Sequence, residues 1–204
     1  KLKVPLTIIP SNLKEEEIDK LSWINYLYYM FIQTEETPNP STLKFIPGKI
    51  LLESGTQEFK SKKSAKSNSL ANMLFEDENV NGVFIGKDFI TITKSDEVNW
   101  ESLKPAILSK IHDFLSSGKK VESQSNKKKI KENYNKKDLD IVKQINELLE
   151  ERIKPAVAQD GGDISFVKFD EGIVYLELRG ACAGCPSSTI TLKSGIENML
   201  KYYI

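Results

Sequence analysis

The 204-residue sequence has few of the features that mark disulfide-rich or membrane proteins. It has only two cysteines, Cys182 and Cys185, and a pair this close would close a very small loop, which excludes a disulfide-stapled fold. The longest apolar run, residues 23–32, is well short of the roughly 20 residues of a membrane-spanning helix. Acidic residues at positions 15–17 and 19 disfavour a secretory or transit signal. We therefore expect an intracellular protein in a reducing compartment, with no membrane segment.

Arginine and histidine are also scarce. Only two of the 29 basic residues are arginines, Arg152 and Arg179. The 29 basic residues are balanced by 29 acidic residues, so the formal net charge is zero. Non-specific nucleic-acid binding needs excess cations, and specific base recognition commonly uses arginine, so no specific nucleic-acid partner is expected. The one histidine, His112, precedes Asp113 on an amphipathic segment and is expected to be an ordinary surface or half-buried residue.

The segment 118–137 divides the chain. It has eight lysines against two glutamates and almost no apolar residues, so it cannot bury enough surface to offset its ordering entropy. We expect a flexible, lysine-rich linker; a basic tether for an acidic partner or RNA is the alternative. The sequence thus predicts an N-terminal extension of unknown role at 1–29 and two small α+β domains, at 30–117 and 138–204.

The first domain shows short strand patterns before and after a short helix. An amphipathic helix then follows, because apolar residues recur at helical spacing from Trp100 to Ser117. A tight turn at Gly86 is expected to join two strands into a hairpin. The predicted strands are 31–35, 43–46, 80–85 and 89–93, and the predicted short helix is 69–75.

The second domain begins with a helix for which Asp138 is the expected N-cap. Pro155 should either stop or kink this helix, and Gly161 and Gly162 then release the chain. A hairpin with strands at 164–169 and 173–178 follows, and a last helix starts at Ser187. The expected apolar positions are Leu139, Val142, Ile145, Leu148, Leu149 and Ile153 in the first helix and Ile190, Leu192, Ile196, Met199 and Leu200 in the last.

Cys182 and Cys185 lie between the end of a predicted strand and the start of the last helix. A helix N-terminus favours thiolate over thiol, and the small neighbours Ala183 and Gly184 leave the sulfurs unshielded, as in a surface ligand loop outside the core. Three chemistries fit the spacing: a thiol–disulfide redox pair, zinc binding, and iron–sulfur cluster binding. A [4Fe-4S] cluster commonly takes four cysteine thiolates, so two protomers related by a two-fold axis would complete the set.

Two longer motifs resemble a known family. The runs Lys154–Ile164 and Leu178–Ser188 are similar to the C-terminal NifU-like (Nfu) domain of iron–sulfur cluster assembly proteins. The run Phe31–Phe45, with Gly48, resembles the Nfu N-terminal domain. Members of this family usually continue past Tyr203 with a further strand; without it the predicted sheet has two strands, which are marginal unless helices cover them.

The resemblance implies a non-enzymatic scaffold or carrier that binds a [4Fe-4S] cluster and transfers it to apo-proteins. Cys182 and Cys185 would be the cluster ligands in a homodimer formed through the C-terminal domain; a [2Fe-2S] cluster or iron alone are alternative cargoes. The implied partners are apo iron–sulfur clients and upstream assembly factors, in the bacterial cytoplasm or the mitochondrial matrix. A dithiol redox protein and a zinc-binding adaptor remain the alternative functions.

Overall fold

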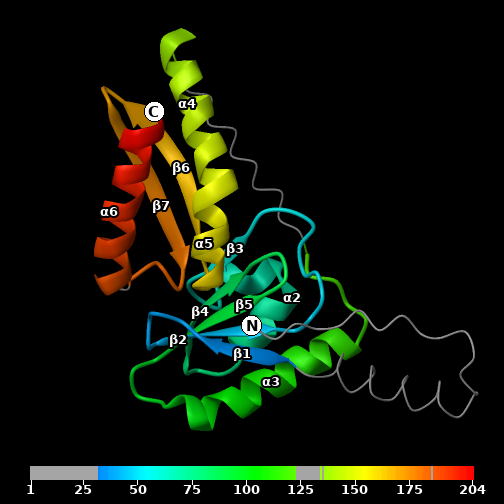
Figure 1. The fold of residues 1–204 in the computed structure, drawn as a ribbon. Helices are drawn as coiled ribbons and strands as arrows, with labels where there is room; N and C mark the ends of the chain where they lie inside the picture. Colours follow the sequence, from blue (N-terminus) through cyan, green and yellow to red (C-terminus); the bar gives the residue numbers. More distant parts are fainter. Residues whose placement is uncertain (1–31, 123–133, 135, 185) are drawn as a thin grey trace, which may run out of the picture. The chain divides into compact units, whose positions relative to one another are not determined.

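The computed structural model describes residues 32–122, 134, 136–184 and 186–204, and residues 32–204 form one compact unit (Figure 1). The predicted extension at 1–29 and most of the predicted linker lie outside the described residues. The described part has one five-stranded and one two-stranded antiparallel sheet, each with its own helices, which confirms two α+β domains. No helix of the described part is long and apolar enough to cross a membrane.

The N-terminal domain, residues 32–122, follows the predicted pattern closely. Its five-stranded sheet has the order β1-β2-β5-β4-β3, and every neighbouring pair is antiparallel. The three-residue strand β3 was not predicted, because so short an edge strand carries no alternating pattern. The elements are β1 (Gln33–Glu36), β2 (Thr42–Ile46), β3 (Gln57–Phe59), the 3-10 helix η1 (Ser64–Ser67), α2 (Ser69–Leu74), β4 (Val80–Ile85), β5 (Ile90–Lys94) and α3 (Trp100–Ser116).

One face of this sheet packs against α2 and α3. Side chains alternate between the faces of a strand, so Val83 and Ile85 of β4 face the helices, as Ile90 and Ile92 of β5 do. The predicted apolar positions of α3 join the same core, with Leu103, Ile107, Ile111 and Phe114 buried. The domain therefore has a continuous hydrophobic core on one side of the sheet.

Asn68 caps α2 from inside this core. Its Oδ1 accepts a hydrogen bond from the Ala71 amide at 2.9 Å, and its Nδ2 donates to Gln57 Oε1 at 3.1 Å. The Asn68→Ala variant should lose about 2 kcal/mol of unfolding free energy, because it removes the cap and leaves a buried partner unsatisfied. Asn99→Ala is the matched control: Asn99 is an exposed cap of α3, and its loss should cost about half as much. Urea unfolding of both variants measures the difference, and equal losses would contradict the prediction.

The structure describes residues 134, 136–184 and 186–204 of the C-terminal domain. Its first helix starts at Lys136, so the prediction that Asp138 is the N-cap was wrong; Asp138 lies in the first turn, where an acidic side chain also suits the helix dipole. Leu139, predicted to be buried, is 50% exposed, and Ile190 of the last helix is 70% exposed. The elements are α4 (Lys136–Leu148), the π-helical turn η2 (Leu149–Ile153), α5 (Lys154–Gln159), β6 (Gly162–Asp170), β7 (Ile173–Gly180) and α6 (Pro186–Tyr203).

Pro155 neither stops the helical segment nor leaves it regular. The π-turn η2 directly precedes it, and the Lys154 amide donates to the carbonyl of Leu149, five residues earlier. Proline has no amide hydrogen and its ring crowds the carbonyl four residues back, so a wider turn accommodates it and the chain continues as α5. Leu149 and Ile153 of this turn are buried in the domain core.

The β6–β7 hairpin carries an irregularity that matches its apolar pattern. The register shifts between Phe166 and Lys168, which leaves Val167 without a strand partner and 40% exposed. Because the bulge adds one residue, Phe166 and Phe169 can both pack on the core although they are three positions apart. Among the described residues of the C-terminal domain this hairpin is the whole sheet, as predicted, and α4, η2, α5 and α6 supply its hydrophobic partners.

Candidate functional site

The cysteine loop connects β7 to α6, as predicted. The strand ends at Gly180, Cys182 lies in the following turn, and α6 begins at Pro186. Cys185 lies outside the described residues. The structure therefore places the first cysteine of the pair at a strand end, immediately before a long helix whose N-terminus carries partial positive charge.

Cys182 is a core residue, which corrects the expectation of a surface loop. Its exposed fraction is 2%, and it packs in the same apolar cluster as Val157, Ile164 and Ile196. Gly162 makes room for it, because a Cβ at that position would lie 2.7 Å from Cys182 Sγ. The small size of neighbours such as Ala183 therefore does not expose this sulfur to solvent. The loop turns inward, and Cys182 packs against Gly162 of the facing strand β6.

Two glycine turns hold the base of the loop. The Ala181 amide donates to the Gly161 carbonyl at 3.2 Å, and the Ala183 amide donates to the Gly180 carbonyl at 3.1 Å. Gly161 and Gly180 have φ values of +80° and +63°, a region that side chains rarely adopt. The predicted end of the helical segment before Gly161 is confirmed, since α5 ends at Gln159 and β6 begins at Gly162.

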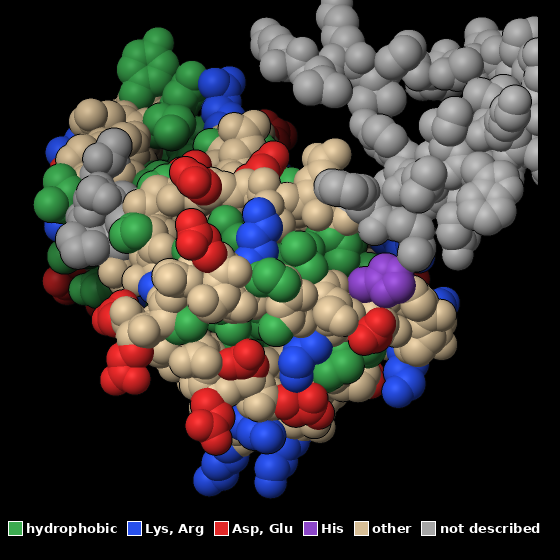
Figure 2. Space-filling model, turned by 90° about the horizontal axis from the view of Figure 1, so that it is seen from below, with side chains coloured by type: hydrophobic (Ala, Val, Ile, Leu, Met, Phe, Trp, Pro, Cys, Tyr) green, Lys and Arg blue, Asp and Glu red, His purple; other side chains and the backbone are tan. Residues whose placement is uncertain are grey.

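Other metal ligands are not gathered around the loop. In the part of the chain that the structure describes, no group of three or more His, Cys, Asp or Glu residues could hold a metal ion. His112 lies on α3 with its Nδ1 3.4 Å from Asp113 Oδ1, and its side chain is on the surface (Figure 2). The predicted partly exposed position of His112 is confirmed, and the described residues of a single chain do not complete a metal site around Cys182.

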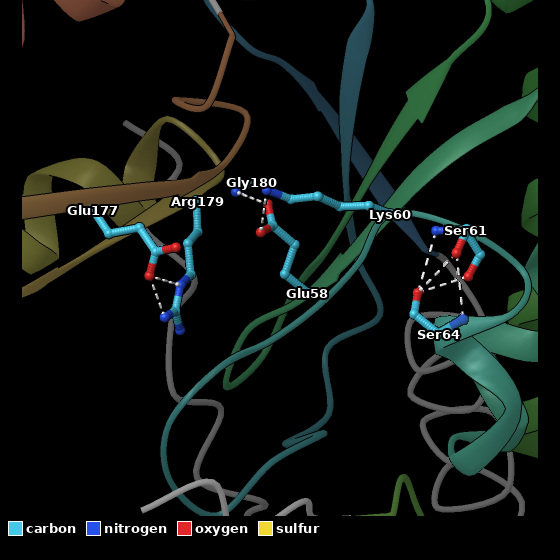
Figure 3. Close-up of polar contacts among 7 residues, drawn as sticks. All are labelled: Glu58, Lys60, Ser61, Ser64, Glu177, Arg179 and Gly180. Atoms are coloured by element: carbon cyan, nitrogen blue, oxygen red, sulfur yellow. Dashed lines mark hydrogen bonds and ion pairs between the residues drawn. The ribbon is translucent and has the colours of Figure 1, made fainter. Parts of the chain in front are cut away.

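Residues of the N-terminal domain contact the base of the loop, and sequence reasoning missed these contacts. Glu58 Oε1 accepts a hydrogen bond from the Gly180 amide at 3.1 Å, while Glu58 also pairs with Lys60 (Figure 3). Arg179, next to Gly180, is paired with Glu177 of the same strand. Glu58 and Gly180 are 122 residues apart in sequence. No periodicity connects positions so distant, so only a structure could reveal the contact.

Comparison with known proteins gives two family matches and close relatives. The family "Scaffold protein Nfu/NifU N terminal" matches residues 32–118, and the family "NifU-like domain" matches residues 145–204. NifU-like protein 5, mitochondrial, of Arabidopsis thaliana is 49% identical over 186 residues, which are 90% of this chain and 68% of that protein. The NFU1 iron-sulfur cluster scaffold homolog, mitochondrial, of Homo sapiens is 49% identical over 177 residues, 86% of this chain and 69% of that protein.

A solved structure is also similar to part of the chain. The solution NMR structure of a NifU-like protein from Saccharomyces cerevisiae covers 46% of this chain and 85% of its own, with 32% identity and a TM-score of 0.42. The chain spans about two thirds of the length of the Arabidopsis and human relatives.

These matches define the class: a two-domain protein with an Nfu N-terminal domain and a NifU-like C-terminal domain. The chain belongs to the NifU-like (Nfu) family.

Proposed function

We propose that this protein is an iron–sulfur cluster scaffold and carrier. It binds a [4Fe-4S] cluster through the thiolates of Cys182 and Cys185, two protomers share the cluster, and the cluster passes to apo-proteins. The observation that carries the proposal is the pair of cysteines in one loop of a NifU-like domain, in a chain 49% identical to a relative named as an iron–sulfur cluster scaffold homolog. The cluster is cargo, so binding and release take the place of catalytic turnover.

The ligand count supports sharing between two copies. Iron–sulfur clusters are commonly held by four thiolates, and this sequence has two cysteines in total. No group of three metal-ligating side chains occurs among the described residues, and the single histidine lies on α3. A two-fold axis through the cluster would bring two identical loops together and give four thiolates from one loop sequence. Such a shared cluster is released when the two copies separate.

The partners follow from this role. A carrier receives its cluster from an upstream assembly factor and delivers it to apo iron–sulfur proteins, so both classes must contact the loop or its surroundings. The relatives from Arabidopsis and human are mitochondrial by name, which supports the mitochondrial matrix over the bacterial cytoplasm as the location of this protein.

The test is anaerobic reconstitution of the full chain with iron and sulfide. The products are separated by size-exclusion chromatography, iron, sulfide and zinc are measured per protomer, and the iron is examined by Mössbauer spectroscopy. The proposal requires about two iron and two sulfide per chain in a dimer, with the parameters of a [4Fe-4S] cluster. One zinc per dimer without sulfide would identify a zinc adaptor, and a metal-free monomer that reduces disulfides would identify a redox protein.

A further inference from the structure

The central strands of the N-terminal sheet, β2, β4 and β5, are buried on both faces, although the helices of this domain cover only one. Phe84 is 2% exposed and lies outside the hydrophobic core formed with α2 and α3, because its neighbours Val83 and Ile85 point into that core. Thr91 of β5 is 1% exposed, and Lys44 of β2 is also buried. We call the face that carries Lys44, Phe84 and Thr91 the second face of the sheet. Its burial is supplied by residues of the C-terminal domain.

The second face meets the two turns that carry the cysteine loop. Thr91 Oγ1 donates a hydrogen bond to the Gly161 carbonyl at 2.7 Å. Lys44 Nζ donates to the carbonyl of Gln159 at 3.1 Å, at the end of α5. On the same face, Glu58 of β3 is the cross-strand partner of Phe84 and accepts from the Gly180 amide (Figure 3). The contacts go to backbone atoms before β6 and at the end of β7.

The approach is close enough to require glycine at both turns. A Cβ on Gly161 would lie 2.9 Å from Thr91 Oγ1, and a Cβ on Gly180 would lie 3.0 Å from Phe84 Cγ. Contacts below 3.4 Å at a Cβ are tighter than nearly all those that real side chains make. Both glycines are therefore used twice, for the backbone turns of the loop and for contact with the other domain.

The contacts reach Cys182 indirectly, through the backbone of the loop. Thr91 and the Ala181 amide donate to the same Gly161 carbonyl, so the hydrogen bond from Thr91 reaches the residue next to the cysteine through one shared atom. Cys182 itself is turned into the core and is 2% exposed. A cluster shared between two copies needs this sulfur at a surface that a second loop can approach, so the structure with the N-terminal domain docked does not suit a bridging cluster.

We infer that the N-terminal domain regulates the cluster-binding loop: docked on the Gly161 and Gly180 turns, it stabilises the loop conformation in which Cys182 packs into the core of its own domain, and its release lets the loop turn the thiol outward for cluster loading. Thr91 and Glu58 are positioning residues, because each acts on the loop backbone and neither would touch the cluster. The inference rests on the proposed function. On loading, the Cys182 thiol loses its proton to solvent as its sulfur bonds to iron, with no change in the oxidation state of the sulfur.

The test measures thiol access in the cluster-free full chain. A Cys185→Ser background leaves Cys182 as the single thiol, and its reaction with an aromatic disulfide reagent is followed by absorbance. Thr91→Val removes one hydrogen bond worth about 1 kcal/mol and keeps the shape of the side chain, so the reaction should be about fivefold faster. Thr91→Ser, which retains the hydroxyl, should react as slowly as the Cys185→Ser parent.

The matched control is Thr93→Val, the same substitution two residues along β5. Thr93 makes no hydrogen bond to the C-terminal domain among the described residues, so its variant should react at the parent rate. Glu58→Leu, which removes the acceptor of the Gly180 amide, is a second and independent probe, and Glu58→Gln keeps an acceptor oxygen. Circular dichroism and thermal unfolding verify that each variant is folded.

The outcomes separate the two proposals. Equal rates for Thr91→Val, Glu58→Leu and the parent would overturn the regulatory contact, as would an equal acceleration by Thr93→Val. Iron and sulfide uptake by the chain with both cysteines tests the scaffold function on its own. A chain that takes up no cluster while Thr91→Val still speeds thiol modification would refute the scaffold function and leave the docking contact standing.

Discussion

Replacing either cysteine with serine should reduce cluster content from about two iron and two sulfide per chain to almost none. Each copy supplies half of the thiolates in the proposed dimer, so one substitution removes two of four ligands at once. A serine hydroxyl is a far poorer ligand for iron than a thiolate at neutral pH. The measurement is iron and sulfide per protomer after anaerobic reconstitution. Stoichiometric iron and sulfide in either variant would contradict the assignment of Cys182 and Cys185 as the cluster ligands.

Substitution of Cys182 should also change the stability of the cluster-free protein. Cys182 is buried among apolar side chains, so Cys182→Ser places a hydroxyl there and should lower the unfolding free energy by about 1–3 kcal/mol. A cysteine in a surface loop, as the small neighbouring residues suggested, would instead tolerate serine with the fold intact. Cys182→Ala is the control, because it removes the ligand without burying a polar group. Urea unfolding of the cluster-free proteins measures the effect.

Gly162→Ala should damage the site without changing a ligand. The added Cβ would lie 2.6 Å from the Arg179 carbonyl oxygen and 2.7 Å from Cys182 Sγ. The backbone oxygen belongs to the strand pair β6–β7, in which Gly162 faces Gly180, so it cannot move without opening the hairpin. We expect a loss of about 1–3 kcal/mol in unfolding free energy, together with a displaced Cys182 and a reduced cluster content.

Gly195→Ala is the matched control for this substitution. Gly195 lies in α6, is exposed, and a Cβ there would meet nothing within 4 Å. Alanine in a helix is favoured over glycine by roughly 0.5–1 kcal/mol, so this variant should be as stable as the parent or more so, with full cluster content. Wild-type stability and full cluster content in Gly162→Ala would show that the close approach of Gly162 and Cys182 is not a constraint.

Local patterns predicted most of the elements. The apolar spacing of α3 and the Gly86 turn between β4 and β5 were confirmed, because each depends on residues close together in sequence. Errors occurred where packing competes with local preference: α4 starts before Asp138, and Leu139 is exposed although it continues an apolar stripe. The π-turn before Pro155 is a compromise between a missing amide hydrogen and a buried helix face, which a residue count does not reveal.

The candidate site was predicted in part. Its place between a strand and a helix follows from the order of the residues, and the family resemblance identified Cys182 and Cys185 as ligand candidates. The burial of Cys182 depends on Gly162 across the hairpin, and the contacts of Thr91 and Glu58 join positions 70 and 122 residues apart. Such long-range placement arises from tertiary packing, for which a single sequence has no periodic signal.

The dependence of Cys182 on Gly162 has a consequence for protein design. A Cys-x-x-Cys segment moved alone onto another hairpin would leave its first sulfur against whatever side chain stands opposite. The transferable unit is larger: it includes the facing glycine of β6 and the Gly180 turn, which belong to the strands and not to the loop. A grafted cluster carrier should therefore be built from the whole hairpin end, with the loop as its smallest part.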